Sequence, residues 1–421
     1  MRLHALSDRS LIRAAGSSTR YVRVSFIAPE TRRGGARLPV NVALVLDRSG
    51  SMAGEKIALA RGAAQQALAL LASDDRFSVV VYDQLVDLLV ESTPATPGAR
   101  RRAGDALDRT DARGSTDLCG GWLRGCEQVG LALGEGTVGR CLLLTDGLAN
   151  HGVTDRGELL RHAAELRARG VATSTFGVGA DFDERLLRDI ARCSGGNFYF
   201  LEHPRQIPDL LASEMGEALE IVARRASLVI ELPAGASAEP LGSHEVRRRD
   251  RSVEIDLGDL VSAQEVELLV AIRFPRGVEG TLAEAGFSIT DSESALDATD
   301  ERLVWTYASH AENDRQPRNR PVDRFVAGAY AGRARGEAAE RNRAHDFDGA
   351  RRVLRGTARK IREYAGDDPE LLGLASSLER ESEDFSGRVF DAMELKRHAF
   401  ASYAASSDRA LDGRAKRGPR P

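Results

Sequence analysis

The chain has 421 residues and a formal net charge of −4. This length exceeds what one hydrophobic core normally supports, so two or three domains are expected. Apolar residues make up 42% and charged residues 29%, as in folded globular proteins, which argues against a disordered chain. The small net charge gives no reason to expect nucleic acid or an anionic membrane as a partner.

The cysteines and the N-terminal segment indicate the cellular compartment in which the protein is expected. None of the four cysteines forms a Cys-x-x-Cys pair or lies near a histidine at zinc spacing, so all four are expected to be reduced and apolar in character. They are Cys119, Cys126, Cys141 and Cys193. Residues 1–18 contain no continuous hydrophobic stretch, and no run of about 18 apolar residues occurs, so we expect neither a signal peptide nor a membrane span. These features predict a cytoplasmic location.

The first 36 residues and residue 37 onward differ in pattern. Residues 1–36 include an alternating run at 19–28 that favours a strand. Residues 37–222 alternate buried strands with helices, which predicts a doubly wound α/β domain with a mainly parallel sheet. The expected strands are 40–46, 76–82, 140–145, 171–178 and 197–201, with an antiparallel partner at 85–90. The expected helices are 55–71, 118–131, 156–169, 184–191 and 208–222.

The spacing of apolar residues changes after this domain. Residues 223–308 hold alternating runs separated by Gly, Pro and Asp, which predict an antiparallel β-sandwich. We hypothesise that the N-terminal strand joins this sandwich. Residues 309–405 are predicted to be helical, with candidates at 323–343, 347–365, 369–381 and 386–405. Residues 406–421 are expected to form a flexible basic tail.

Three short motifs bring oxygen-bearing side chains to strand ends and loops. They are Asp47-Arg48-Ser49-Gly50-Ser51, Gly114-Ser115-Thr116-Asp117 and Thr145-Asp146-Gly147. Ligands of a parallel α/β sheet lie beyond the carboxyl ends of its strands, where Asp47 and Asp146 are expected. The candidate ligands are two carboxylates and three hydroxyls, which are hard oxygen donors that select Mg²⁺, Mn²⁺ or Ca²⁺ over zinc or copper.

Electrostatics favour a cation between the two aspartates. Two carboxylates about 5 Å apart repel by roughly 3 kcal/mol at an effective dielectric of 20. A bound dication reverses the sign of that interaction. Asp-x-Ser-x-Ser alone is a weak signal, because Asp, Ser and Gly are ordinary turn and cap residues. Its combination with Thr116 and Asp146 makes a metal site the favoured interpretation.

The order Asp47-x-Ser49-x-Ser51, Thr116, Asp146 resembles the metal-ion-dependent adhesion site of von Willebrand factor type A domains. The flanking residues are similar to the bacterial intracellular branch of that family. The resemblance covers residues 37–222 and implies a six-stranded sheet with an antiparallel edge. It also implies that Ser49, Ser51 and Thr116 bind Mg²⁺ directly, and that both aspartates act directly or through water. Residues at the rim would be Ser115, Asp117, Gly147 and His151.

The resemblance implies a binding protein and not an enzyme. The sixth metal position would take a Glu or Asp carboxylate from a partner protein. Analogy with bacterial relatives adds an AAA-type ATPase as a candidate partner. Two alternatives stay open: a structural scaffold whose metal site is unused, and a metal-dependent hydrolase. The hydrolase would need a base and a substrate pocket near Asp146. Ser49 itself is not expected to be a catalytic nucleophile, because it lacks the Gly-x-Ser-x-Gly context of a nucleophile elbow.

Overall fold

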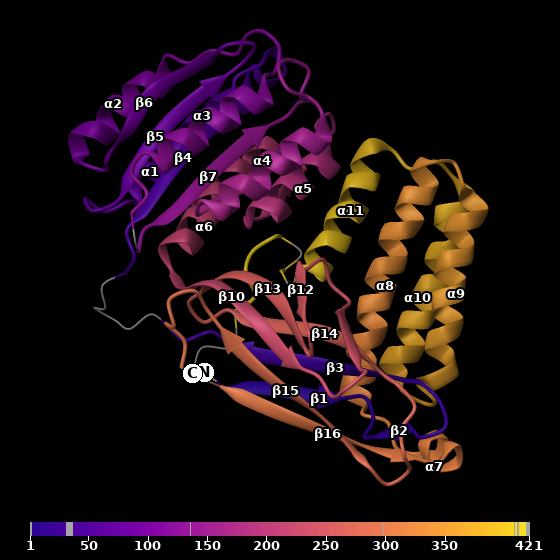
Figure 1. The fold of residues 1–421 in the computed structure, drawn as a ribbon. Helices are drawn as coiled ribbons and strands as arrows, with labels where there is room; N and C mark the ends of the chain where they lie inside the picture. Colours follow the sequence, from indigo (N-terminus) through magenta and orange to yellow (C-terminus); the bar gives the residue numbers. More distant parts are fainter. Residues whose placement is uncertain are drawn as a thin grey trace. The chain divides into compact units, whose positions relative to one another are not determined.

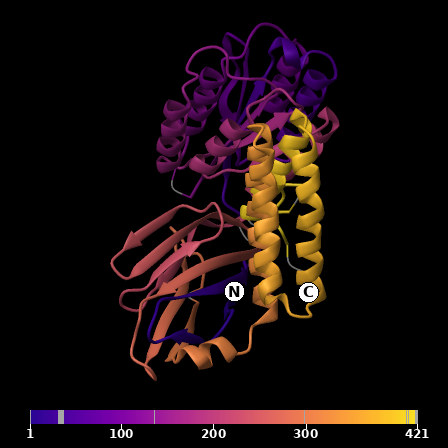
Figure 2. The same ribbon diagram turned by 90° about the vertical axis from the view of Figure 1, so that its right-hand side faces the viewer.

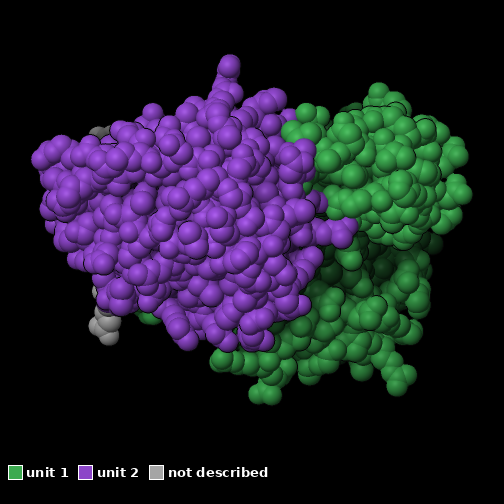
Figure 3. All heavy atoms as spheres, turned by 90° about the horizontal axis from the view of Figure 1, so that it is seen from above, with its two compact units in different colours: residues 1–31, 222–411, 415–421 green, residues 32–221, 412–414 purple. Residues whose placement is uncertain are grey.

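The structure, a computed structural model, describes residues 2–30, 37–134, 136–297, 299–407, 409–410 and 412–417. The chain divides into two compact units, coloured separately in Figure 3. Unit 1 comprises residues 1–31, 222–411 and 415–421, and unit 2 comprises residues 32–221 and 412–414. The long internal segment is therefore one folding unit, and the two flanks of the chain combine to make the other.

Unit 2 is built on a six-stranded sheet of order β6-β5-β4-β7-β8-β9. Its strands are β4 (Val40–Asp47), β5 (Arg76–Tyr82), β6 (Val86–Pro94), β7 (Val138–Thr145), β8 (Val171–Val178) and β9 (Phe198–Leu201). All neighbouring strands are parallel except β6, which pairs antiparallel with β5 at one edge. Every residue of β4, β7 and β8 is buried, as expected for strands covered on both faces. The predicted fold class is confirmed.

Helices cover both faces of this sheet (Figure 1). They are α1 (Glu55–Ala69), α2 (Pro97–Asp108), α3 (Leu118–Gly130), α4 (Arg156–Ala168), α5 (Glu184–Ser194) and α6 (Ile207–Leu219). Thr173 in β8 bonds to Trp122 of α3, with 2.9 Å between the indole nitrogen and the hydroxyl. The next residue, Ser174, points to the opposite face and donates to Glu214 of α6 at 2.5 Å. Because strand side chains alternate, α3 and α6 lie on opposite faces.

Unit 1 contains two more sheets. A four-stranded sheet has the order β1-β3-β14-β11, and a six-stranded sheet has the order β12-β13-β10-β15-β16-β2. The N-terminal strands are β1 (Leu3–Ser7), β2 (Leu11–Arg13) and β3 (Ser18–Ile27). The later strands are β10 (Ile221–Glu231), β11 (Ser237–Pro240), β12 (Val246–Arg249), β13 (Ser252–Val261), β14 (Glu265–Phe274), β15 (Leu282–Thr290) and β16 (Asp300–Ala308). The N-terminal strand β3 pairs along its whole length with β14, some 240 residues later.

Side chains from both sheets of unit 1 share one apolar core. Val22, Val24 and Phe26 of β3 alternate with more exposed residues, and Phe287 and Trp305 come from the other sheet. Four strands were not predicted individually, because each has only three to five residues: β1, β2, β11 and β12. Gln264 also forms an isolated antiparallel bridge with Arg417 in the C-terminal segment.

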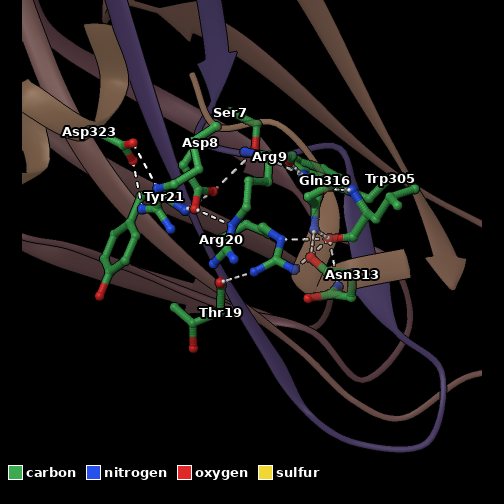
Figure 4. Close-up of polar contacts among 12 residues, drawn as sticks. Ser7, Asp8, Arg9, Thr19, Arg20, Tyr21, Trp305, Asn313, Gln316 and Asp323 are labelled. Atoms are coloured by element: carbon green, nitrogen blue, oxygen red, sulfur yellow. Dashed lines mark hydrogen bonds and ion pairs between the residues drawn. The ribbon is translucent and has the colours of Figure 1, made fainter. Parts of the chain in front are cut away.

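A polar cluster lies where β2, β3 and the helix that follows β16 meet (Figure 4). The buried Arg20 guanidinium donates to the main-chain carbonyl of Leu11 at 2.7 Å from Nε and to that of Thr19 at 2.8 Å. Asn313 and Gln316 donate to the same Leu11 carbonyl at 3.1 and 3.2 Å. Burial lowers the pKa of Arg20 to about 10, so the guanidinium stays charged at neutral pH. The cluster ties β2 and β3 to the helix that follows β16.

The C-terminal part of unit 1 is helical. Its helices are α7 (His310–Arg315), α8 (Arg320–Arg343), α9 (Phe347–Ala365), α10 (Pro369–Gly387) and α11 (Ala392–Ser406). The four long helices lie beside one another in Figure 1, and Figure 2 shows the same group after a 90° turn. Buried Asn342 of α8 donates to the carbonyls of Phe385 and Arg388, both at 2.8 Å, and so fixes the turn between α10 and α11. This turn lies later than predicted, because Asp391 caps α11. Within the described ranges, every helix is too short or too polar for a membrane-spanning segment.

Candidate metal centre

The two predicted aspartates lie at the carboxyl ends of adjacent central strands. Asp47 is the last residue of β4, and Asp146 follows the last residue of β7. The two strands run parallel in register, with Leu46 opposite Leu144. Both carboxyl groups are fully buried. The parallel pairing therefore brings residues that are 99 positions apart in sequence to one edge of the sheet.

The Asp47 carboxylate is held by contacts to both of its oxygens. Oδ1 accepts a 2.7 Å hydrogen bond from the main-chain nitrogen of Ser49, and Oδ2 accepts one of 2.6 Å from the Thr145 hydroxyl. Burial raises the pKa of Asp47 to about 6, although these hydrogen bonds oppose the increase. The carboxylate thus orients the loop that follows β4.

Ser49, Ser51 and Asp146 form a continuous chain of oxygens. The Ser49 and Ser51 hydroxyl oxygens are 3.1 Å apart, and the Ser51 hydroxyl donates to Asp146 Oδ1 at 2.6 Å. The main-chain nitrogen of Gly50 donates to the carbonyl of Gly114 at 3.0 Å, which joins this loop to the second motif. Two of the three predicted motifs are thus directly bonded through their main chains.

Thr116 reaches the same place from the second motif. Its side chain is buried, and a Cβ placed on Gly147 would lie 3.5 Å from the Thr116 hydroxyl and 3.7 Å from the Ser51 hydroxyl. The Thr116 and Ser51 hydroxyls therefore both lie next to Gly147. Ser115 takes part differently, because its main-chain nitrogen donates to the Gln84 side chain at 2.9 Å. The Thr116 hydroxyl is thus the one that the structure places near Ser51 and Gly147.

The remaining rim residues have local structural contacts. Asp117 caps α3, accepting from the main-chain nitrogen of Gly120 at 2.9 Å. His151 is half-exposed, and its Nδ1 lies 3.9 Å from Asp117 Oδ2. The main-chain nitrogen of His151 donates to the Thr116 carbonyl at 3.2 Å. Both residues therefore have a structural role, and their position at the rim of a metal site stays a prediction.

Asn150 positions Thr116, a role that the sequence analysis missed. Its side-chain oxygen accepts from the main-chain nitrogen of Thr116 at 2.8 Å, and its own main-chain nitrogen donates back to the Thr116 carbonyl at 3.2 Å. Asn150 lies four residues after Asp146, in the loop that follows β7. The loop after β7 therefore supplies the candidate ligand Asp146, and through Asn150 it also holds the loop that supplies Thr116.

A group of charged residues supports the other side of the site. Buried Asp83 accepts from Arg48 Nε at 3.0 Å and from Arg113 Nε at 2.7 Å. Burial alone would raise the pKa of Asp83, but the hydrogen bond from Arg113 and both positive charges hold it below its ordinary value. The main-chain nitrogen of Arg113 donates to the Arg48 carbonyl at 2.7 Å. These contacts clamp the first motif to the second.

Lys56, in the first turn of α1, was also missed. Its ammonium group is ion-paired with Asp146 Oδ2 and donates to the main-chain carbonyl of Ser51 at 3.2 Å. The lysine side chain is partly exposed, whereas Asp146 is fully buried. Asp146 is thus contacted by a hydroxyl on one oxygen and by a cation on the other.

The donor set fits a hard divalent cation. Three hydroxyls and two carboxylates converge from the ends of β4 and β7 and from the Gly114–Asp117 loop. Among the described residues, no group of three or more His, Cys, Asp or Glu side chains is arranged to hold a metal ion. A metal bound here would therefore rely on Ser and Thr hydroxyls, which are neutral ligands suited to Mg²⁺ and Mn²⁺.

Residues 41–213 match the family model for the von Willebrand factor type A domain. The chain carries a von Willebrand factor type A (VWA) domain. The six-stranded sheet with its antiparallel edge and the placement of the three motifs agree with that match. The matched segment lies within unit 2, so the VWA domain coincides with the α/β part of the protein.

Similar proteins include bacterial chains that extend beyond the VWA domain. An uncharacterized protein of Synechocystis sp. is 29% identical over 275 residues, which is 63% of this chain and 64% of the relative. The uncharacterized protein YfbK of Escherichia coli is 26% identical over 284 residues, 65% of this chain and 49% of the relative. The chain thus spans less than two thirds of either relative.

A similar solved structure extends over nearly the whole chain. The von Willebrand factor type A structure from Catenulispora acidiphila has a TM-score of 0.71 and covers 96% of this chain and 96% of its own. The two sequences are 17% identical. This similarity shows that the folds agree, with flanking β and helical regions as well as the VWA domain.

Proposed function

We propose that the VWA domain binds Mg²⁺ at this site and uses the ion to recognise a carboxylate on another protein. The supporting observation is how the carboxylates are held. Both oxygens of Asp47 are engaged by Thr145 and Ser49, while Asp146 is engaged by Ser51 and Lys56. The Ser49, Ser51 and Thr116 hydroxyls are then the groups that a metal would contact directly. An ion with few anionic ligands stays electrophilic and favours an acidic group at its open position.

The surroundings of the site suit a protein partner. Leu148, two residues after Asp146, is 55% exposed. Leu85 is 56% exposed and follows Gln84, whose side chain holds Ser115. Exposed leucines are ordinary when single, but two beside a charged site offer apolar contact area around it. The partner we propose therefore presents a Glu or Asp with apolar neighbours.

We propose a binding role and not catalysis. The two alternatives from the sequence have distinct tests. A hydrolase would turn over a phosphate or ester substrate, and the Asp47→Ala variant would lose that turnover. A scaffold with an unused site would keep its partners in the presence of chelator. An AAA-type ATPase is one candidate partner, inferred only from the resemblance.

The proposal is tested by capture with and without metal. The full chain is immobilised and exposed to cell extract in Mg²⁺ or in EDTA, beside the Asp47→Ala variant and the matched Ser115→Ala control. The identified partner is then purified and each acidic residue of its binding segment is changed to the amide. We expect binding that needs Mg²⁺, is lost in Asp47→Ala and in one such amide variant, and is kept in Ser115→Ala. Binding that survives both EDTA and Asp47→Ala would contradict the proposal.

A further inference from the structure

The Lys56 ammonium occupies the position of a counter-cation at the candidate metal centre. It pairs with Asp146, a carboxylate that is fully shielded from solvent, and it also donates to the main-chain carbonyl of Ser51. Ser51 is itself a candidate metal ligand. Lys56 therefore contacts two of the five residues that the metal would use.

The charges near the site show what this contact does. Asp47 and Asp146 contribute two negative charges, and Arg48 is already committed to Asp83 and Asp87. Lys56 leaves the metal-free site with one net negative charge instead of two. A buried carboxylate without a partner is strongly unfavourable, so Lys56 stabilises the site before metal arrives.

A divalent ion and the ammonium compete for the same carboxylate. A metal placed among the Ser49, Ser51 and Thr116 hydroxyls would approach Asp146 and repel a positive charge paired to it. The Lys56 stem is partly exposed, so the ammonium has a route toward solvent. With metal bound, the two aspartates, the ion and Lys56 together carry one net positive charge.

We infer that Lys56 is a built-in counter-cation of the metal site: it neutralises Asp146 in the metal-free protein, is displaced from it by the divalent ion, and thereby sets the metal affinity. Lys56 is thus a positioning residue and not a metal ligand. The ammonium released from Asp146 keeps the occupied site positive, which favours an anionic partner group. This inference rests on the proposed metal site.

The test compares Lys56→Met with Lys56→Arg in the full chain. Lys56→Gln serves as a second uncharged variant, and Lys360→Met, at an exposed position on α9, is the matched control. Mg²⁺ binding is measured by calorimetry and thermal stability is measured in EDTA. We expect both uncharged variants to bind Mg²⁺ at least tenfold more tightly than the parent and to melt at a lower temperature in EDTA. Lys56→Arg and Lys360→Met should stay close to the parent in both measurements.

The outcomes separate this inference from the proposed function. Parent protein that binds Mg²⁺ with an affinity unchanged or weakened by Lys56→Met and Lys56→Gln would overturn the inference and leave the metal site standing. Mg²⁺ binding by Lys56→Met and Lys56→Gln, with none by the parent, would support the inference. Absence of binding in every folded variant would overturn both.

Discussion

The Thr145 hydroxyl donates a 2.6 Å hydrogen bond to Asp47 Oδ2 and so links the ends of the two central strands β4 and β7. Both residues are fully buried. The bond lowers the pKa of Asp47 against the effect of burial. It also fixes the orientation of the Asp47 carboxylate, whose Oδ1 accepts a hydrogen bond from the main-chain nitrogen of Ser49. Thr145 therefore supports the candidate metal site without being one of its ligands.

Thr145→Val should weaken both the fold and the site. Valine has nearly the same shape but leaves Asp47 Oδ2 without its donor, which should cost about 1–3 kcal/mol of stability. Loss of a supporting contact of this kind typically lowers metal affinity by about 10- to 100-fold. Denaturant unfolding and Mg²⁺ calorimetry measure the two effects. Thr145→Ser keeps the hydroxyl and should retain most of the affinity, so equal losses in both variants would argue against this role.

Asn150→Ala should lower Mg²⁺ affinity by about tenfold, since the Thr116 main-chain nitrogen loses its 2.8 Å partner. Asn150→Asp keeps an acceptor at that position and should lose less. His151→Ala is the matched control, because the bond from residue 151 to Thr116 is made by the main chain. Calorimetry of the three variants tests the claim, and an effect of His151→Ala as large as that of Asn150→Ala would refute it.

Arg20→Met should destabilise unit 1 by about 2–4 kcal/mol, because it removes charge-assisted bonds to the Leu11 and Thr19 carbonyls. The chain has two tryptophans, Trp122 in unit 2 and Trp305 in unit 1. A Trp122→Phe background therefore leaves Trp305 fluorescence as a reporter of unit 1. Denaturant unfolding in that background should show the loss. The prediction would be wrong if Arg20→Met left the unfolding midpoint of Trp305 unchanged and shifted only that of Trp122, measured in a Trp305→Phe background.

Glu394→Gln should reduce stability in a pH-dependent way. The Arg388 guanidinium and the main-chain nitrogen of Asp391 hold the pKa of Glu394 at about 2. A depressed pKa means that the ionised form stabilises the folded state, fully above the unfolded pKa and progressively less as pH falls. The parent should therefore exceed the variant in stability at pH 6, with the gap shrinking between pH 4.5 and 2. Circular dichroism during denaturant unfolding at several pH values would detect this, and a gap independent of pH would disprove it.

Features with a strong local signal could be predicted from the sequence. The buried strands of the VWA domain are long apolar runs, and 76–82 and 171–178 coincide with β5 and β8. The five candidate ligands were chosen from the order of the motifs and, for Asp47 and Asp146, from their position at strand ends; their role as metal ligands stays a prediction. The helix α2 was missed because its buried stripe consists of only Ala99, Ala103 and Leu107 in an Arg- and Gly-rich segment. The Thr96 cap followed by Pro97 was the signal available there.

The supporting contacts of the site could not be predicted. Lys56 meets Asp146 across 90 residues of sequence, and Thr145 meets Asp47 across 98. A charged residue in the first turn of a helix and a threonine at a strand end are individually unremarkable. Their roles depend on strand order and helix placement, which only the folded chain fixes. Trp122 is fully buried and its indole nitrogen donates to the Thr173 hydroxyl at 2.9 Å, so it packs α3 against the sheet.

The central claim is tested most directly by Mg²⁺ calorimetry on the parent protein beside Asp47→Ala, Thr116→Ala and Ser115→Ala. The proposed site predicts saturable binding of one ion in the parent and in Ser115→Ala, and its loss in the other two variants. Circular dichroism confirms that each variant is folded. Absence of Mg²⁺ binding by the folded parent, or binding that persists in both Asp47→Ala and Thr116→Ala, would contradict the claim.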